Sequence, residues 1–511
     1  MRDVALLSLV LMLSWPMSAQ AGGIDQVTGP VPVPPGRAIY GSSQVPGSVL
    51  APDMEASGYI EEEYFIAGKA DAYRHENGTA NVMATEIPYV TRIIIRRPAD
   101  RDRFSGVMHV EPIHPSRGGT THWLINADYL MRRGDIYVAI GMGDDAPSRR
   151  LSKGAEFPSA QSQVTRWYDP VRYQGQSWPE EDGIRYDVLA GIGRFLRSEM
   201  NANPLQGWSV KAALVGGWSF TGSVQRTFIN EGFHDRERLP DGKPIFDGYL
   251  IGISSRWNGG GYVPLNSGEQ VTSVDDPRRT LRAIDVPVIE FLSEFEVATG
   301  PGEQKTDSDA MAGQHRIYEM GATIHSDSLT DPRQPRSQRP NYVQLAAKGY
   351  PAEALKSASD DCPLPLSDVD HPAYSRAVLD NLRKWVIEGT PPPRIQPLQR
   401  DVDGIARDDT GNPLGGLRAA EFVAPLASYG LYSGAEYPTC IATSGRPIFV
   451  RQDLTTAELV RRYGTEAGYL SSFDKAVDEL VTQRWLLAED GGELKQRARS
   501  RAAIAFGKEA R

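Results

Sequence analysis

A lone serine stands between a short apolar run and a segment with few helix breakers, in the stretch ALVGGWSFTG that covers residues 213–222. The apolar run is typical of a buried strand, and the segment after Ser219 can form a helix. The glycines on either side of the serine permit a tight turn and close packing of the helix. A serine at the apex of such a turn exposes its hydroxyl as a nucleophile, and we predict this role for Ser219. The alternative is a serine that only caps the helix.

A serine hydroxyl is a weak nucleophile unless a base removes its proton. Among the eight histidines, His325 follows an expected strand over 316–320 and lies in a loop of small residues. Imidazole titrates near neutrality, so it can take the serine proton and later return it to a leaving group. Its place downstream of the serine and of an acidic segment gives the order Ser, acid, His, and we predict that His325 is the base.

Two carboxylates, Glu294 and Glu296, follow an expected strand over 286–292. A carboxylate beside the base would hold the correct tautomer and stabilise the imidazolium. Glu296 lies further past the strand end, where the loop can reach a histidine, and we predict that it is the acid. Glu294 remains the alternative, and either side chain can instead be a solvated loop charge.

Acyl transfer also requires N–H donors for the developing oxyanion. Phe220, directly after the serine, is expected to supply one backbone N–H. The loop after an expected strand over 106–111 is expected to supply the other. Pro112 has no N–H, which leaves Ile113 or His114 as the second donor.

Three tryptophans are candidates for the wall of an apolar or aromatic acyl pocket, and core packing explains each of them about as well. They are Trp218, Trp123 and Trp257. The sequence contains no Cys/His cluster with metal-ligand spacing, and the glycines at 259–261 lack the lysine of a phosphate loop. We therefore expect neither a metal nor a cofactor.

The elements that must position these groups alternate along the chain. The expected strands cover 59–66, 89–97, 106–111, 136–140, 212–215, 249–253, 286–292 and 316–320, and the expected helices cover 123–132, 182–200, 374–388 and most of the chain from 455. This alternation predicts an α/β fold, with a mostly parallel central sheet and helices on both faces. In such sheets, sites form at the carboxyl ends of the strands, where the serine, the acid and the histidine stand.

The N-terminus has a basic start, a short apolar core and small residues before a cleavage site, so we predict that residues 1–21 are a signal peptide. A Pro- and Gly-rich lead-in is expected over 22–58, followed by one α/β domain over 59–511. Within it, residues 340–511 form a helical and irregular extension that either packs on the core or acts as a lid. Export places the protein in the periplasm or outside the cell, and Cys362 and Cys440 are expected to pair there in a disulfide.

With 55 Lys and Arg against 65 Asp and Glu, the formal net charge is −10, and no basic run stands out. We therefore do not expect the protein to bind nucleic acid or anionic membranes. No apolar run after the N-terminal segment reaches the ~18 residues of a membrane span. A small-molecule substrate is the expected partner.

With these residues in view, the chain resembles the alpha/beta-hydrolase superfamily, and more narrowly a group of bacterial proteins known as alpha/beta hydrolase domain-containing. The shared motifs are RIIIRRP at 92–98, VE at 110–111, WYDPVRY at 167–173, GWSFTG at 217–222, Trp385 with GTPPP at 389–393, and GN at 411–412 with GGLR at 415–418. The resemblance implies a Ser-acid-His triad, carried onto Ser219, Glu296 and His325. Three positions depart from the usual pattern: Thr221 replaces a glycine, Phe220 stands where glutamine is more frequent, and Glu296 stands where aspartate is.

The leading hypothesis is an exported serine hydrolase that cleaves carboxylic esters through an acyl-enzyme. A second hypothesis keeps the triad and changes the bond to an amide, a lactone or a C–C bond. A third is a catalytically silent binding protein on the same fold. An intact Ser-acid-His order argues against the third.

Overall fold

The computed structural model describes residues 23–48, 52–144, 155–254, 261–270, 273, 276–299, 306–323, 325, 336–356, 361–402, 404–432, 434, 436–442 and 446–507. The predicted signal peptide over 1–21 and Trp257 lie outside these residues.

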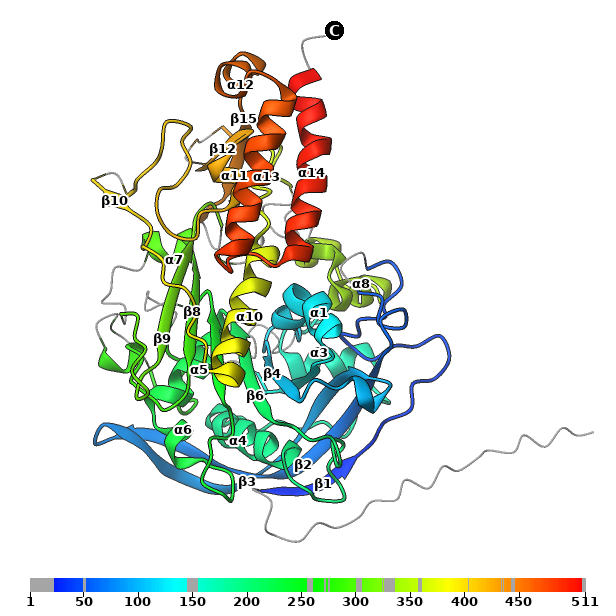
Figure 1. Ribbon diagram of the computed structural model, residues 1–511. Helices are drawn as coiled ribbons and strands as arrows, with labels where there is room; N and C mark the ends of the chain where they lie inside the picture. The colour runs from blue at the N-terminus through cyan, green and yellow to red at the C-terminus, as the bar shows by residue number, and fades with distance from the viewer. Residues whose placement is uncertain are drawn as a thin grey trace, which may run out of the picture.

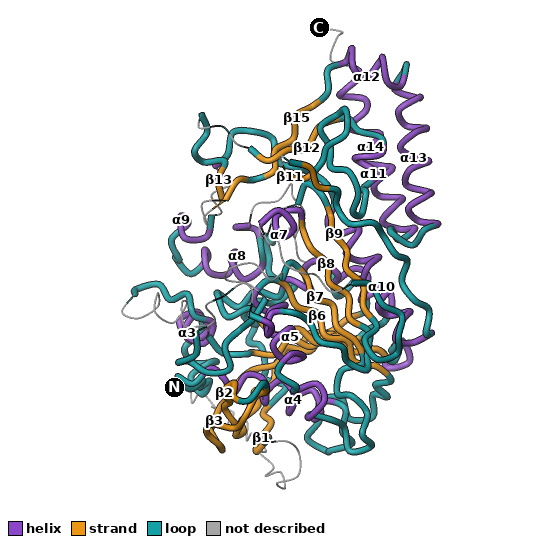
Figure 2. Tube along the Cα trace, turned by 90° about the vertical axis from the view of Figure 1, so that its left-hand side faces the viewer, coloured by secondary structure: helices purple, strands orange, loops and turns teal. Residues whose placement is uncertain are grey.

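A nine-stranded sheet forms the centre of the described chain, in the order β1-β2-β3-β5-β4-β6-β7-β8-β9 (Figures 1 and 2). Its strands are β1 Ile24–Thr28, β2 Tyr59–Glu76, β3 Thr79–Pro98, β4 Val107–Ile113, β5 Ile136–Gly141, β6 Ala212–Trp218, β7 Gly248–Gly252, β8 Val288–Ser293 and β9 His315–Met320. All neighbouring pairs from β5 to β9 are parallel, and the pairs that involve β1, β2 and β3 are antiparallel. The predicted mostly parallel sheet is confirmed.

The sequences of the central strands are continuous apolar runs, because both faces of the sheet are covered. One face packs against α1 (Thr121–Arg133) and α10 (His371–Glu388), and the other against α4 (Arg185–Leu196) and α5 (Phe220–Asn230). Successive residues of β3 show the alternation directly, since Ile94 belongs to the first layer while Ile93 and Ile95 belong to the second. The helices on both faces confirm the predicted architecture.

Shorter helices complete the layers and the connections. They are α3 Gln161–Tyr168, α6 Phe233–Arg236, α7 Glu294–Thr299, α8 Pro340–Ala347, α9 Ala352–Leu355 and α11 Ala420–Val423, with 3-10 turns at Arg101–Arg103, Asp182–Ile184, Pro277–Arg279 and Arg336–Gln338. The helix expected over 182–200 is therefore shorter than predicted, because its first turn is a 3-10 turn and α4 ends at Leu196. Small strand pairs occur in the extension at β10 Arg400–Asp401 with β11 Gly404–Ile405, β12 Ala427–Leu431 with β15 Phe449–Asp453, and β13 Ile441–Ala442 with β14 Arg446–Pro447.

The lead-in is part of the domain. Its β1 pairs antiparallel with β2 and so forms one edge of the sheet. Tyr40 is fully buried, and its backbone N–H donates to the hydroxyl of Tyr173. The boundary predicted at residue 59 is therefore misplaced, because a five-residue strand between proline-rich turns leaves too short an alternation to stand out in the sequence.

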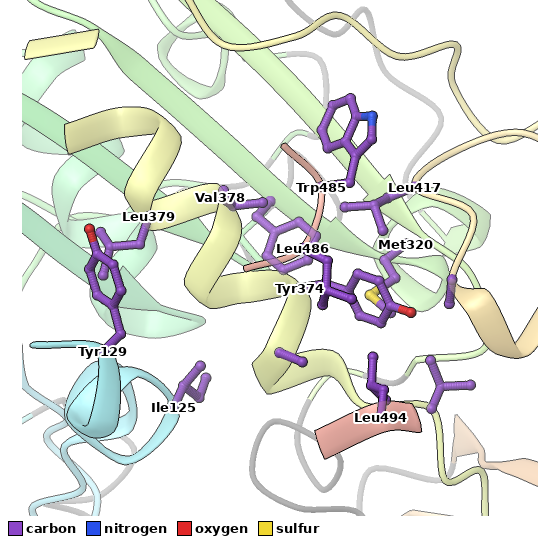
Figure 3. Packing of buried hydrophobic residues seen from close by; sticks show 14 of the residues in the cluster. Ile125, Tyr129, Met320, Tyr374, Val378, Leu379, Leu417, Trp485, Leu486 and Leu494 are labelled. Atoms are coloured by element: carbon purple, nitrogen blue, oxygen red, sulfur yellow. The ribbon is translucent and has the colours of Figure 1, made fainter. Parts of the chain in front are cut away.

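The C-terminal extension packs on the core. In α10, Asp370 caps the N-terminus by accepting from the N–H of Ala373, and Gly389 ends the helix in the left-handed region. Beyond it, α12 (Thr456–Tyr463), α13 (Glu466–Thr482) and α14 (Ala488–Gly507) confirm the expected helical tail, and α13 and α14 stand side by side (Figure 1). Figure 3 shows the shared cluster, in which side chains of α10 lie between residues of α1 and residues of β9 and the C-terminal segment. None of the helices formed by the described residues has the length and apolar character to cross a membrane.

Cys362 and Cys440 form a disulfide, as predicted. The two residues are 78 positions apart, so the bond closes a long loop inside the extension. Closing a loop of this length restricts the unfolded chain and is expected to contribute about 4 kcal/mol to the free energy of unfolding. Urea unfolding of Cys362→Ala/Cys440→Ala should show this loss. Added reductant should destabilise the wild type and leave the double variant unaffected, and equal midpoints for the two proteins would contradict the prediction.

Candidate active site

Ser219 lies at the junction of β6 and α5 with φ 57° and ψ −120°. A non-glycine residue in the left-handed region is strained, and that conformation lifts the serine out of the strand at the end of the sheet. Two bonds hold the turn. The backbone N–H of Ser219 donates to the carbonyl of Gly252 on β7, and the hydroxyl of Thr221 accepts from the N–H of Trp218.

The glycines of this motif serve close packing, and the turn itself falls on the serine. The strand β6 runs through both glycines to Trp218, further than the predicted end at residue 215. A Cβ on Gly216 would lie 2.3 Å from the ring of His122, and a Cβ on Gly217 would lie 2.6 Å from the carbonyl oxygen of Thr221. The sequence therefore contains glycines because helices approach the strand on both sides.

The structure brings the three predicted residues together in a continuous chain of hydrogen bonds. The Oγ of Ser219 lies 2.6 Å from Nε2 of His325, and Nδ1 of His325 lies 2.6 Å from Oε1 of Glu296. The side chain of Glu296 is fully buried, whereas the side chain of His325 is 23% exposed. A carboxylate can only accept, so Nδ1 of the imidazole carries a proton and Nε2 faces the serine hydroxyl as an acceptor.

The other oxygen of Glu296 is held by Ser293, a residue that the sequence analysis missed. Both the backbone N–H and the hydroxyl of Ser293 donate to Oε2 of Glu296. Ser293 directly precedes α7, and Glu296 is its third residue, so the pair has the Ser-x-x-Glu spacing of a capping box. This spacing was the signal available in the sequence for choosing between the two glutamates.

Glu294 contacts the loop that leads to His325. Its Oε2 accepts from the backbone N–H of Ala322 at 2.7 Å, and its Oε1 pairs with Arg407 from the extension. Burial raises the pKa of Glu294, and the nearby guanidinium opposes that rise. Glu294 therefore ties the histidine loop to the extension, and the geometry gives the place beside His325 to Glu296.

Arg407→Met is expected to leave the buried carboxylate of Glu294 without its cation. Removing one partner of a buried pair costs about 3 kcal/mol, which urea unfolding at neutral pH should detect. Since the protonated carboxyl no longer needs the cation, the difference from wild type should shrink as the pH is lowered. Arg407→Met/Glu294→Gln is the matched control and should recover part of the loss, and a stable Arg407→Met at neutral pH would contradict the prediction.

Of the predicted oxyanion donors, Phe220 is placed as expected. It is the first residue of α5, so its N–H has no acceptor within the helix. Ile113 is the last residue of β4, level with Gly141 of β5, and its N–H remains a predicted donor. The backbone N–H of His114 donates to the carbonyl of Gly119 at 2.9 Å. The prediction of a backbone donor at His114 is therefore wrong, because the turn of its own loop already uses that N–H.

Two of the predicted pocket tryptophans belong to the core. Trp218 is 1% exposed and packs against Phe291 and His371, with ring centroids 6.3 and 5.7 Å away. Trp123 is also 1% exposed, and its indole N–H donates to the hydroxyl of Ser43. Side chains buried to this degree present no wall to a substrate, which corrects the prediction for both.

The described residues contain one group with metal-ligand geometry, formed by His234, Asp235 and Asp285. Guanidinium groups already pair with its acids, since Arg238 contacts both aspartates and Arg282 contacts Asp235. A cation at this place would have to displace two arginines, so we assign no metal to it.

The chain matches the sequence model of the alpha/beta hydrolase domain family over residues 27–496, and it belongs to that family. The strand order and the placement of helices agree with this class, so the predicted superfamily is confirmed. No curated protein matches the sequence.

Several solved structures share part of the fold. A thermostable esterase from Pseudomonas putida ECU1011 is 13% identical, with 61% of this chain and 90% of that chain covered and a TM-score of 0.30. A dienelactone hydrolase from Anabaena variabilis ATCC 29413 is 11% identical, with 56% and 96% covered and a TM-score of 0.25. An alpha-beta serine hydrolase homologue from Coxiella burnetii is 13% identical, with 46% and 84% covered and a TM-score of 0.26. These scores are low, so the class rests on the family model and on the strand order.

Proposed function

We propose that the protein is a serine hydrolase of small-molecule carboxylic esters. The observation that carries the proposal is the chain of hydrogen bonds from Ser219 through His325 to Glu296. This arrangement supports the proposal, because acyl transfer requires a nucleophile, a base and an orienting acid within hydrogen-bond reach of one another. The strained backbone of Ser219 supports the same role, since strain at a polar residue on a strand-to-helix turn is typical of nucleophiles in this fold class.

In the proposed reaction, Oγ of Ser219 attacks the ester carbonyl while Nε2 of His325 takes the hydroxyl proton. Glu296 stabilises the imidazolium that forms. The tetrahedral intermediate collapses, and His325 gives the proton to the departing alcohol, which leaves an acyl group on Ser219. Water, activated by the same histidine, then releases the acid and restores the serine.

The proposal is tested by reaction of the purified protein with a fluorophosphonate probe, followed by peptide mapping. We expect a single label on Ser219 together with turnover of p-nitrophenyl esters, whose dependence on acyl length measures the acyl pocket. A folded protein that takes no label and turns over no ester would overturn the proposal and favour a binding protein on the same fold.

Export to the periplasm or the medium is part of the same proposal. It rests on the N-terminal pattern of residues 1–21, and the Cys362–Cys440 disulfide supports an oxidising compartment. Mass spectrometry of the mature chain should find a new N-terminus at Gly22. A protein that retains Met1 in the cytoplasm would contradict it.

A further inference from the structure

The loop that leads from β9 to His325 contains a strained residue. Ala322 has φ 55°, in the left-handed region, which is unfavourable for a residue with a side chain. A residue other than glycine keeps such a conformation only where its surroundings hold it there. Ala322 is 1% exposed and lies three positions before the proposed base, so the groups that hold it must come from the protein. The contacts of Ala322 therefore bear on where His325 lies.

Two hydrogen bonds hold Ala322, one on each side of its backbone. Its N–H donates to Oε2 of Glu294 at 2.7 Å, and its carbonyl accepts from the hydroxyl of Ser367 at 3.0 Å. Glu294 belongs to α7, which also carries Glu296, whereas Ser367 belongs to the C-terminal extension. Both of the bonded side chains are buried. The extension therefore fixes one side of the strained residue.

Helix α7 holds the rest of the loop. The backbone N–H of Phe295 donates to the carbonyl of Thr323 at 3.4 Å, and Oε1 of Glu296 lies 2.6 Å from Nδ1 of His325. The ring of Phe295 also lies against the imidazole, with the two centroids 6.2 Å apart. Contacts at Ala322, Thr323 and His325 therefore align the loop with the helix that carries the acid.

The strand β15 fixes the backbone around Ser367. The N–H of Ser367 donates to the carbonyl of Phe449 at 2.9 Å, and the N–H of Arg451 donates to the carbonyl of Pro365 at 2.7 Å. The hydroxyl of Ser367 is thus attached to a segment that is paired with a strand of the extension. Such a donor can keep the loop in one position, because its own backbone is held independently of the loop.

We propose that Ser367 is a positioning residue for the catalytic base, a role that rests on the proposed ester hydrolysis. Its hydroxyl keeps Ala322 in the left-handed conformation, and this conformation places the imidazole of His325 within reach of both Ser219 and Glu296. Without the hydroxyl, the carbonyl of Ala322 is buried without its donor, which favours a shift of the backbone. A shift of a catalytic group by about 1 Å can lower a rate about 10²-fold.

Ser367→Ala is expected to lower kcat for p-nitrophenyl esters about 10–100-fold, with KM within about twofold. Reaction with the fluorophosphonate should slow in parallel, because it requires the same base. Ser198→Ala is the matched control, since the hydroxyl of Ser198 also donates to a backbone carbonyl, that of Phe195 in α4. This control should keep the kcat of the wild type. Thermal unfolding of both variants checks the fold.

Ala322→Gly separates positioning from a general loss of stability. Glycine adopts the left-handed conformation without strain, so the turn should depend less on Ser367. We expect Ala322→Gly alone to keep kcat within about threefold of wild type, and Ser367→Ala/Ala322→Gly to recover about fivefold in kcat relative to Ser367→Ala. If the hydroxyl served stability alone, the glycine would bring no recovery at a temperature where every variant is folded.

Proton NMR of the free protein gives a readout of the base that needs no substrate. The Nδ1 proton of His325 lies in a short hydrogen bond to Glu296 and should give a far-downfield resonance in the wild type. We expect this resonance to persist in Ser198→Ala. In Ser367→Ala it should broaden or disappear, because a displaced ring exposes the proton to exchange with water.

A Ser367→Ala protein with the kcat of the wild type would overturn the role of Ser367 and leave the proposed function standing. An unchanged downfield proton in that variant would do the same, and so would a loss of kcat that Ala322→Gly does not recover. A folded wild-type protein without turnover or label would overturn the proposed function, and this inference with it.

Discussion

Ser219→Ala is expected to lower kcat for ester hydrolysis by at least about 10⁴-fold and to abolish labelling by the fluorophosphonate. The reason is geometric: the hydroxyl of Ser219 is the one that the triad histidine contacts, at 2.6 Å. Alanine fits the same turn without the hydroxyl, although the left-handed backbone is strained for either residue. Steady-state kinetics on p-nitrophenyl esters, with thermal unfolding to verify the fold, provide the measurement.

Ser223→Ala is the matched control, because Ser223 is also on α5 and its hydroxyl bonds to that of Ser254 at 2.8 Å. This variant should stay active and keep its label. His325→Ala should lose about as much activity as Ser219→Ala, and the double variant should lose little more, since residues that act as a unit are not additive. Turnover close to wild type in Ser219→Ala would contradict the assignment of the nucleophile.

Glu296→Gln is expected to lower kcat by about 10³–10⁴-fold while the protein stays folded. The amide can present its NH₂ to Nδ1 of His325, and Nδ1 must then accept. The proton moves to Nε2, which can no longer take the proton of the serine. Kinetics across acyl lengths should show the loss in kcat for every ester, because the defect lies in proton transfer and leaves substrate binding unchanged.

Glu294→Gln is the control for this experiment, since the hydrogen bonds described for that side chain join it to Ala322 and Arg407. Its kcat should stay within about tenfold of wild type, because we expect Glu294 to stabilise a loop and to take no part in proton transfer. A larger loss in Glu294→Gln than in Glu296→Gln would reverse the assignment of the acid.

Much of the candidate site could be predicted because parallel strands bring their carboxyl ends to one edge. Ser219, Glu296 and His325 each follow a strand in the sequence. Their positions after strand ends were enough to predict that they lie at the same edge of the sheet. The choice of Glu296 also has a local cause. Its side chain accepts from Ser293 with one carboxylate oxygen and reaches His325 with the other.

Other parts of the site depend on contacts that a linear pattern does not contain. The N–H of His114 is used within its own loop, and only the loop conformation reveals this. Trp218 and Trp123 were predicted to line a pocket but are buried in the core. A tryptophan in an apolar stretch of sequence suits either place equally. The edge strand β1 was missed because pairing with β2, more than its own five residues, makes it a strand.

Contacts between distant parts of the chain hold the loop that leads to the histidine. Glu294 is tied to Arg407, 113 positions further along, and the disulfide that closes the extension uses Cys440. During synthesis the serine, the acid and the histidine are thus all made before the segment that fastens the histidine loop. Such long-range closure is slow compared with local folding. We therefore expect the histidine loop to reach its full stability only after the segment that carries Arg407 has been made.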